Sequence, residues 1–86
     1  MANTTINLVV EKETIEYYSD IKIVAFDNCE TAEEYFKIKV KESIDDDREY
    51  FDTVNYDEKN SNYEAFEMGN EAEYNHYIYT DTCQVL

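Results

Sequence analysis

Acidic side chains gather in the middle of the chain, in the stretch Ile44–Glu58. This stretch holds seven carboxylates and several aromatic side chains against a single arginine, Arg48. The three consecutive aspartates Asp45–Asp47 repel one another and gain nothing from burial. We therefore expect them to stay in water unless a metal ion or a basic surface neutralises them. The chemistry that this stretch favours is binding to a cationic partner.

The charge of the whole chain points the same way. The 86 residues carry a formal net charge of -14, from 21 acidic and 7 basic side chains. Residues 1–41 contain eight acids and five lysines, whereas residues 42–86 contain thirteen acids with only Arg48 and Lys59 as basic residues. Repulsion of this size opposes compaction and favours attraction to cations. The C-terminal half is the more strongly charged part.

The composition disfavours direct nucleic-acid binding and enzymatic activity. Phosphate contacts need lysine and arginine, so this chain would be repelled from DNA or RNA. A glycine-rich phosphate loop cannot form with one glycine. Cys29 or Cys83 with a single histidine gives little support for a thiol nucleophile. We expect no catalytic residue and no cofactor.

Two local patterns resemble metal sites but lack essential parts. Asp45, Asp47 and Glu49 stand at alternate positions as in a calcium loop, yet the loop glycine and the distal glutamate are missing. Glu73 and His76 have the Glu-x-x-His spacing of metal-binding helices, but their segment alternates like a strand, which places the two side chains on opposite faces. No metal is expected at either place. His76 is instead predicted to be a sheet side chain with one hydrogen bond.

Rows of carboxylates can imitate a nucleic-acid backbone. Alternate residues of a strand lie about 6.6 Å apart, and helix neighbours at i, i+3 or i+4 lie about 5–6 Å apart, which is similar to the spacing of successive phosphates. A solvated surface without a partner is the alternative explanation. The candidate carboxylates for partner binding are Asp45, Asp46, Asp47, Glu49, Asp52, Asp57, Glu58, Glu64, Glu67, Glu71 and Glu73.

Tyrosines are the second kind of candidate. Packing is the commoner role for most of the nine tyrosines. Exposed tyrosines beside carboxylates, however, anchor protein interfaces, because they supply a rigid ring and a hydroxyl. The tyrosines that we expect at the partner-binding surface are Tyr50, Tyr56 and Tyr63.

The chain is predicted to be one folded domain, residues 1–86. Its 43% hydrophobic content, with nine tyrosines and four phenylalanines, is too apolar for a disordered acidic tail. There is no proline, repeat or linker. The N-terminal stretch has no basic start and no long apolar run, so we expect neither a signal peptide nor a membrane span, and a cytoplasmic location. Cys29 and Cys83 are expected to be free, partly buried thiols.

Alternating apolar residues predict strands near the N-terminus. Ile6, Leu8 and Val10 give a strand over residues 4–12, and residues 15–18 and 21–26 continue the sheet. Residues 27–30 read as a turn. Thr31 to Glu34 has the spacing of a helix capping box, but Phe36, Ile38 and Val40 alternate with lysines, which predicts a strand over residues 35–43. The lysines should then pair with carboxylates of a neighbouring strand.

The second half predicts one helix and a hairpin. The spacing of Ile44, Phe51 and Val54 favours a helix in the central segment, with the aspartates at its start, where the helix dipole favours negative charge. Residues 60–62 interrupt it. Residues 63–68 and 72–82 form two strands joined by a two-residue turn at Gly69-Asn70. The expected fold is α+β, an antiparallel sheet of four or five strands with one short helix.

In overall character the chain resembles small, very acidic inhibitors that imitate nucleic acid, among them anti-CRISPR proteins, anti-restriction proteins and uracil-DNA glycosylase inhibitors. The resemblance implies a viral or mobile-element protein that blocks the basic groove of a nucleic-acid-binding protein or nuclease complex of the host. It assigns no residue. An immunity protein or antitoxin that covers a cationic toxin is the alternative, and a metal-dependent enzyme using Asp45 and Asp47 is the third.

Overall fold

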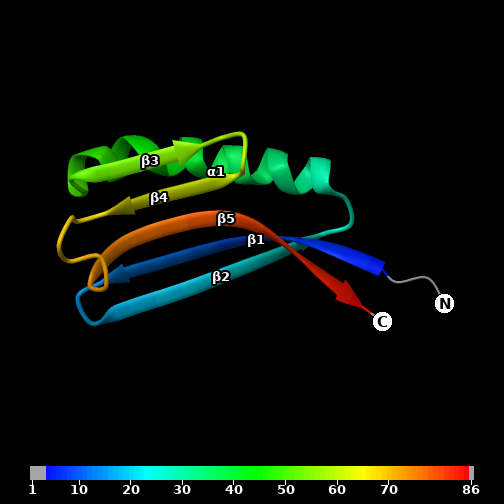
Figure 1. Ribbon diagram of the computed structural model, residues 1–86, viewed down its shortest axis with the longest axis horizontal. Coiled ribbons are helices and arrows are strands. Elements are labelled where there is room, and N and C mark those ends of the chain that lie inside the picture. Colours follow the sequence, from blue (N-terminus) through cyan, green and yellow to red (C-terminus); the bar gives the residue numbers. More distant parts are fainter. Residues whose placement is uncertain (1–3, 86) are drawn as a thin grey trace.

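The fold is a five-stranded antiparallel sheet with one long helix across one face. The computed structural model describes residues 4–85 and, within that range, the side chains of residues 5–84. The elements in chain order are β1 (Thr4–Ile15), β2 (Tyr18–Phe26), α1 (Cys29–Tyr50), β3 (Thr53–Asp57), β4 (Asn62–Phe66) and β5 (Tyr74–Val85). The order in the sheet is β2-β1-β5-β4-β3, and all neighbours are antiparallel (Figure 1). The α+β prediction is confirmed.

The helix α1 is the main departure from the sequence analysis. It spans 22 residues, so the predicted strand over residues 35–43 is wrong, as is the prediction of a short helix. Phe36 and Val40 are fully buried, whereas Ile38 between them is 57% exposed. The apolar residues therefore follow a helical period, with Ala32, Phe36 and Val40 on one face, and the alternation with lysine had no structural meaning.

Local capping explains where α1 begins. Asn28 is the N-cap, and its side chain accepts a hydrogen bond from the Thr31 backbone N–H at 2.8 Å and one from the Thr31 hydroxyl at 2.9 Å. The N-cap residue Asn28 thus lies three residues before Thr31, where the sequence suggested a capping box. Lysine, glutamate and alanine, which are good helix formers, fill much of the segment that follows.

The central acidic segment ends the helix and does not begin it. Residues 44–50 are helical as predicted, but they form the last turns of α1, and residues 53–57 form β3. Asp45–Asp47 consequently lie where the helix dipole disfavours negative charge. The placement of the aspartates at a helix start was wrong because the chain upstream of them is helical too.

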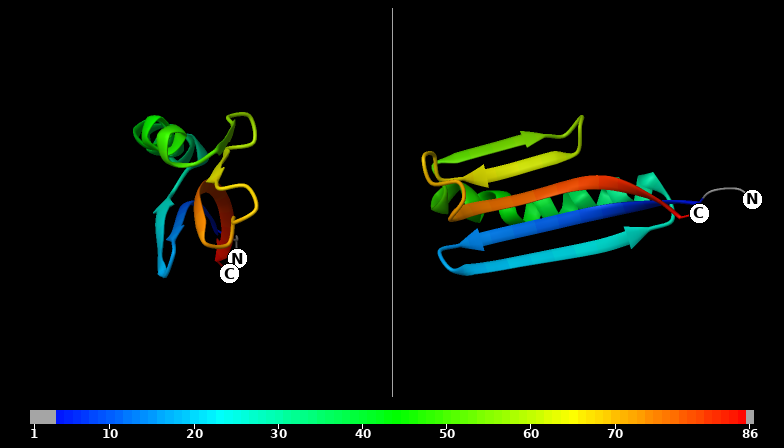
Figure 2. Two further views of the ribbon diagram at one scale, coloured as in Figure 1. Left: turned by 90° about the vertical axis from the view of Figure 1, so that its left-hand side faces the viewer. Right: turned by 60° about the horizontal axis from the view of Figure 1, so that its bottom comes forward.

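The core lies between α1 and the inner face of the sheet. It comprises the buried residues Val9, Ala32, Phe36, Val40, Phe51, Tyr63, Ala65 and Ile78. Figure 2 shows the helix on one side of the curved sheet, and no other element of residues 4–85 covers the opposite face. In these residues no helix is long and apolar enough to cross a membrane.

The predicted C-terminal hairpin is present, with a longer connection. Strands β4 and β5 pair from Asn62↔Tyr79 to Phe66↔Asn75, so the two-residue turn is wrong and residues 67–73 form the connection. Gly69 has the positive φ that was predicted for it, +86°. Residues 60 and 61 of the predicted break lie in the turn between β3 and β4, whereas Asn62 is already the first residue of β4.

Candidate partner-binding site

Three chain segments meet at one end of the molecule, on the left of Figure 1. They are the turn between β1 and β2, the connection between β4 and β5, and the C-terminal end of α1. The Glu16 N–H donates to the Glu73 carbonyl at 2.9 Å, and the Met68 N–H donates to the Asp52 carboxylate at 2.9 Å. We call this region the acidic end and define it by its exposed carboxylates Glu16, Glu49, Asp52, Glu67, Glu71 and Glu73.

Long-range hydrogen bonds fix the geometry of the acidic end. Asp52 follows the helix directly, and its bond to Met68 ties the end of α1 to the connection between β4 and β5. The Tyr74 hydroxyl donates to a Glu16 carboxylate oxygen at 3.1 Å. This hydrogen bond, with some desolvation, raises the pKa of Tyr74 above its ordinary value. The carboxylates of Asp52 and Glu16 are therefore held by hydrogen bonds although they are exposed.

Apolar and aromatic side chains protrude among these carboxylates. Tyr17 is fully exposed at the tip of the β1–β2 turn, Met68 is 66% exposed, and Tyr50 at the end of α1 is 57% exposed. Such side chains contribute most of the binding energy at many protein interfaces. Tyr50 was predicted from the sequence. Tyr17 and Met68 were not, because only the fold shows that their two turns lie beside the end of α1.

The predicted carboxylates fall into separate groups. Asp52, Glu67, Glu71 and Glu73 lie at the acidic end together with Glu49, and Asp45 and Asp46 are exposed one turn further back along α1. Asp57 and Glu58 lie at the turn between β3 and β4. There Glu58 pairs with Lys37 of α1 at 3.4 Å, so this lysine binds a turn residue and not a neighbouring strand.

Other predicted residues lie elsewhere. Glu64 faces away from the helix, opposite Tyr77 of β5, because its neighbours Tyr63 and Ala65 are buried under α1. Tyr56 is 38% exposed and stands beside the rings of Phe36 and Tyr63. Desolvation, followed by the charges of Glu64 and of the acidic-end residue Glu71, raises the pKa of Tyr77, so both carboxylates lie within electrostatic range of this hydroxyl.

Asp47 and Tyr63 correct the prediction most clearly. Asp47 was expected in water but is only 8% exposed, and Tyr63 was expected at an interface but is fully buried. The Tyr63 hydroxyl donates to the Asp47 carboxylate at 2.6 Å. Burial, followed by this hydrogen bond, raises the pKa of Tyr63 above its ordinary value. Asp47 lies on the same face of α1 as Phe36 and Val40, and this face packs against the sheet, so Asp47 is buried.

His76 is the centre of the buried polar cluster. Its Nδ1 is 2.7 Å from the Asp47 carboxylate and its Nε2 is 2.7 Å from the Glu11 carboxylate. Burial alone would lower the pKa of His76, but the hydrogen bonds and charges of Asp47 and Glu11 outweigh it, so the pKa is raised. Each ring nitrogen faces an acceptor, which fits an imidazolium donating both N–H groups. His76 thus has two partners and not the single one predicted.

Lys39 completes the cluster. Its ammonium lies 3.7 Å from the second oxygen of Glu11, so two carboxylates face one imidazolium and one ammonium. Every buried polar side-chain atom among the described residues has a hydrogen-bond partner. The cluster links α1, β1, β4 and β5, and its arrangement is that of a compensated structural network.

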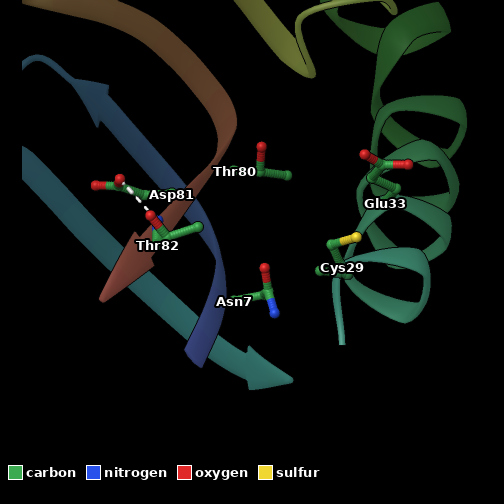
Figure 3. Close-up of a pocket in the computed structure, with 7 residues that line it drawn as sticks. Asn7, Cys29, Glu33, Thr80, Asp81 and Thr82 are labelled. Carbon is green, nitrogen blue, oxygen red and sulfur yellow. Dashed lines mark hydrogen bonds between the residues drawn. The ribbon is translucent and has the colours of Figure 1, made fainter. Parts of the chain in front are cut away.

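A cavity lies toward the other end of α1 (Figure 3). It measures about 320 Å³ and is lined by Asn7, Cys29, Ala32, Glu33 and residues 80–82. In Figure 3, Cys29 and Glu33 of the helix face Asn7 and Thr80 of the sheet. Cys29 and Cys83 are both free thiols, as predicted. Both are exposed, whereas they were predicted to be partly buried. The cavity brings together no pair of groups with an evident chemical function.

The described residues contain no group of three or more His, Cys, Asp or Glu side chains placed to hold a metal ion. The alternate residues Asp45, Asp47 and Glu49 do not converge, since Asp47 is buried and the other two are exposed. Glu73 is exposed and His76 is buried, so these two do not share a site either.

No protein-family model, curated protein or solved structure matches this chain at a significant level. Its function therefore has to be inferred from the charges and contacts of its own residues.

Proposed function

We propose that this protein is an inhibitor that mimics nucleic acid and occupies the basic groove of a nucleic-acid-binding protein or nuclease complex, in the manner of anti-CRISPR and anti-restriction proteins. The observation that carries the proposal is the large set of exposed, uncompensated carboxylates at the acidic end and along α1. A basic groove is the complementary surface for such a set.

Few of these carboxylates are neutralised within the protein. Among residues 5–84, the carboxylates that form ion pairs are those of Glu11, Asp47 and Glu58. Glu11 and Asp47 belong to the buried cluster. Asp45, Asp46 and all members of the acidic end form no ion pair in that range. Their charge is therefore available to a partner, at the cost of repulsion within the free protein.

The helix supplies a regular row of such charges. Exposed acids recur at four-residue steps along α1, and each step advances about 6 Å along the axis and turns about 40° around it, so the row winds across the exposed side of the helix. The row consists of Glu30, Glu34, Glu42 and Asp46, with the exposed Ile38 at its middle position. Glu30, Glu34 and Glu42 were not among the predicted site residues, because that part of the chain was read as a turn and a strand.

The row is not uniform. Lys37 and Lys41 lie beside its middle, so the two ends of α1 are more acidic than the centre. The C-terminal end is the more suitable for binding, because Tyr50, Tyr17 and Met68 protrude there and can bury apolar surface against a partner. We therefore place the centre of the interface at the acidic end and the last turns of α1.

A competition titration tests the proposal. The partner is first captured from a host lysate on the immobilised protein and eluted with concentrated salt, so that the elution does not itself select proteins that nucleic acid displaces. With this partner purified, the protein and nucleic acid should exclude each other, and association should slow as salt rises. A ternary complex of undiminished affinity would overturn groove mimicry. A partner that nucleic acid never displaces would instead support the immunity-protein alternative.

Charge-neutral variants locate the interface. Asp45→Asn, Asp46→Asn and Glu49→Gln together should slow association by about tenfold or more at low salt, because steering depends on these charges. The matched control is Asp27→Asn, Glu33→Gln and Asp81→Asn, three exposed acids toward the other end of the molecule, which should change the rate less. Asp47 is left unchanged because it is part of the buried cluster. Equal effects of the two triple variants would contradict the placement at the acidic end.

A further inference from the structure

The edge strand β2 is long and regular, and the charged residues Asp20 and Lys22 are the only edge-protecting features that it carries. It is nine residues long, and its pairing with β1 runs without a bulge from Ile15↔Tyr18 to Asn7↔Phe26. The chain contains no proline. The opposite edge strand, β3, has only five residues. A long regular edge is a template for pairing with another strand, whereas a short one is not.

The open edge of β2 also carries apolar side chains. Ile21 and Ile23 are 59% and 60% exposed on the sheet face that α1 does not cover. The two-residue turn after Ile15 makes Ile15 and Tyr18 a hydrogen-bonded pair, and such pairs alternate along an antiparallel ladder. The backbone N–H and C=O groups of Ile21 and Ile23 therefore point to the open edge.

β2 is neutral in a chain of net charge -14, since Asp20 and Lys22 are its only charged residues. The register places Asp20 opposite Glu13 of β1, and like charges directly opposite each other are destabilising. Neither Asp20 nor Lys22 forms an ion pair within the range of side chains described. Asp20 thus lies beside another carboxylate, and Lys22, which lines the same small pocket as Glu13 and Asp20, forms an ion pair with neither of them.

We propose that β2 pairs antiparallel with β2 of a second copy of this chain, about a two-fold axis at Ile21. This register puts Asp20 of each copy opposite Lys22 of the other, so symmetry gives two ion pairs. It also keeps Ile21 against Ile21 and places Ile23 on the same sheet face. Registers centred on Lys22 or Ile23 give like-charge contact or no ion pair. The partner copy thus gives Asp20 and Lys22 the ion pairs that neither forms with the described residues of its own chain.

Two single charge reversals and their mixture test the register. Wild-type protein should show a concentration-dependent monomer–dimer equilibrium by sedimentation in the micromolar to millimolar range at moderate salt. Asp20→Lys alone puts lysine opposite lysine, and Lys22→Asp alone puts aspartate opposite aspartate. Each should raise the dimer dissociation constant by about tenfold or more. An equimolar mixture of the two variants restores both ion pairs and should form a heterodimer with nearly wild-type affinity.

Controls separate this pairing from the effect of net charge. The control variants Asp46→Lys and Lys59→Asp make the same charge changes at exposed positions outside β2. Each control variant should still form a homodimer. Asp20→Lys should also raise the stability of the monomer, because the introduced ammonium would face the Glu13 carboxylate. A monomer at every concentration, dimers that both reversals leave unchanged, or a mixture that fails to recover would each overturn the proposal.

Discussion

Carboxylates occur in two contrasting environments in this protein. In the buried cluster, Asp47 and Glu11 each lie 2.7 Å from a nitrogen of His76, with Tyr63 and Lys39 completing the hydrogen bonds and charges. At the acidic end, carboxylates such as Glu49 and Glu71 are exposed and have no ion pair among the described residues. Both regions contain aspartate and glutamate, but among the described residues only the buried cluster places cationic side chains beside them.

The buried cluster contributes to the free energy of folding, whereas the exposed carboxylates are suited to contribute to the free energy of binding a partner. A carboxylate leaves water without a large penalty only if cations and donors replace its hydration, and the buried cluster provides both. The exposed carboxylates keep their hydration and repel one another, which opposes folding but attracts cationic partners. We therefore expect changes in the cluster to affect mainly stability and changes at the acidic end to affect mainly binding.

Removing the imidazole should have the largest effect on stability. In His76→Ala, Asp47 and Glu11 lose their shared cation, and breaking a buried charge network in this way costs about 3–5 kcal/mol of unfolding free energy. Chemical denaturation measures it. His76→Gln, which keeps a hydrogen-bonding side chain without the charge, should lose less. A loss below about 1 kcal/mol for His76→Ala would mean that the cluster does not hold the fold together.

Raising the pH should weaken the same cluster by a smaller amount. The pKa of His76 is raised in the folded protein above the ordinary value of about 6.5 that applies to the unfolded chain. Its contribution is therefore fully present below about pH 6.5 and is lost as the pH rises through the folded-state pKa. The unfolding free energy of the wild type should fall over that window. The His76→Gln variant should lack this slope, and an equal slope in both proteins would contradict the assignment.

Neutralising one exposed carboxylate should have the smallest effect. Asp46→Asn removes a charge from the last turns of α1, where the dipole disfavours it, in a chain of charge -14. The unfolding free energy should change by no more than about 0.5 kcal/mol, toward greater stability. Melting at low and high sodium chloride checks the cause, because salt screens this repulsion and should reduce the gain. A loss above about 1 kcal/mol would show that Asp46 has a structural role.

Local patterns predicted β1, β2, β4 and β5, but they misassigned the helix and placed β3 within the segment predicted to be helical. The alternation of Ile6, Leu8 and Val10 is found in β1, and the hairpin pairing of β4 with β5 is present. Between residues 35 and 43, however, the sequence satisfies both periods, since Phe36 and Val40 are four apart and also alternate with lysine. Burial of these two residues with Ala32 against the sheet decided for the helix, and that contact is not a local property.

The sequence by itself determined that this protein is small and strongly acidic, with a surface rich in carboxylates, because composition and net charge do not depend on how the chain packs. The local periodicities of the sequence indicated the α+β class. Only the tertiary structure decided which carboxylates form that surface. Asp47 and its neighbour Asp46 are chemically alike, yet the rotation of α1 against the sheet buries one beside His76 and exposes the other. The positions of His76 and Glu11, far from Asp47 in the chain, made that burial possible by replacing the lost hydration.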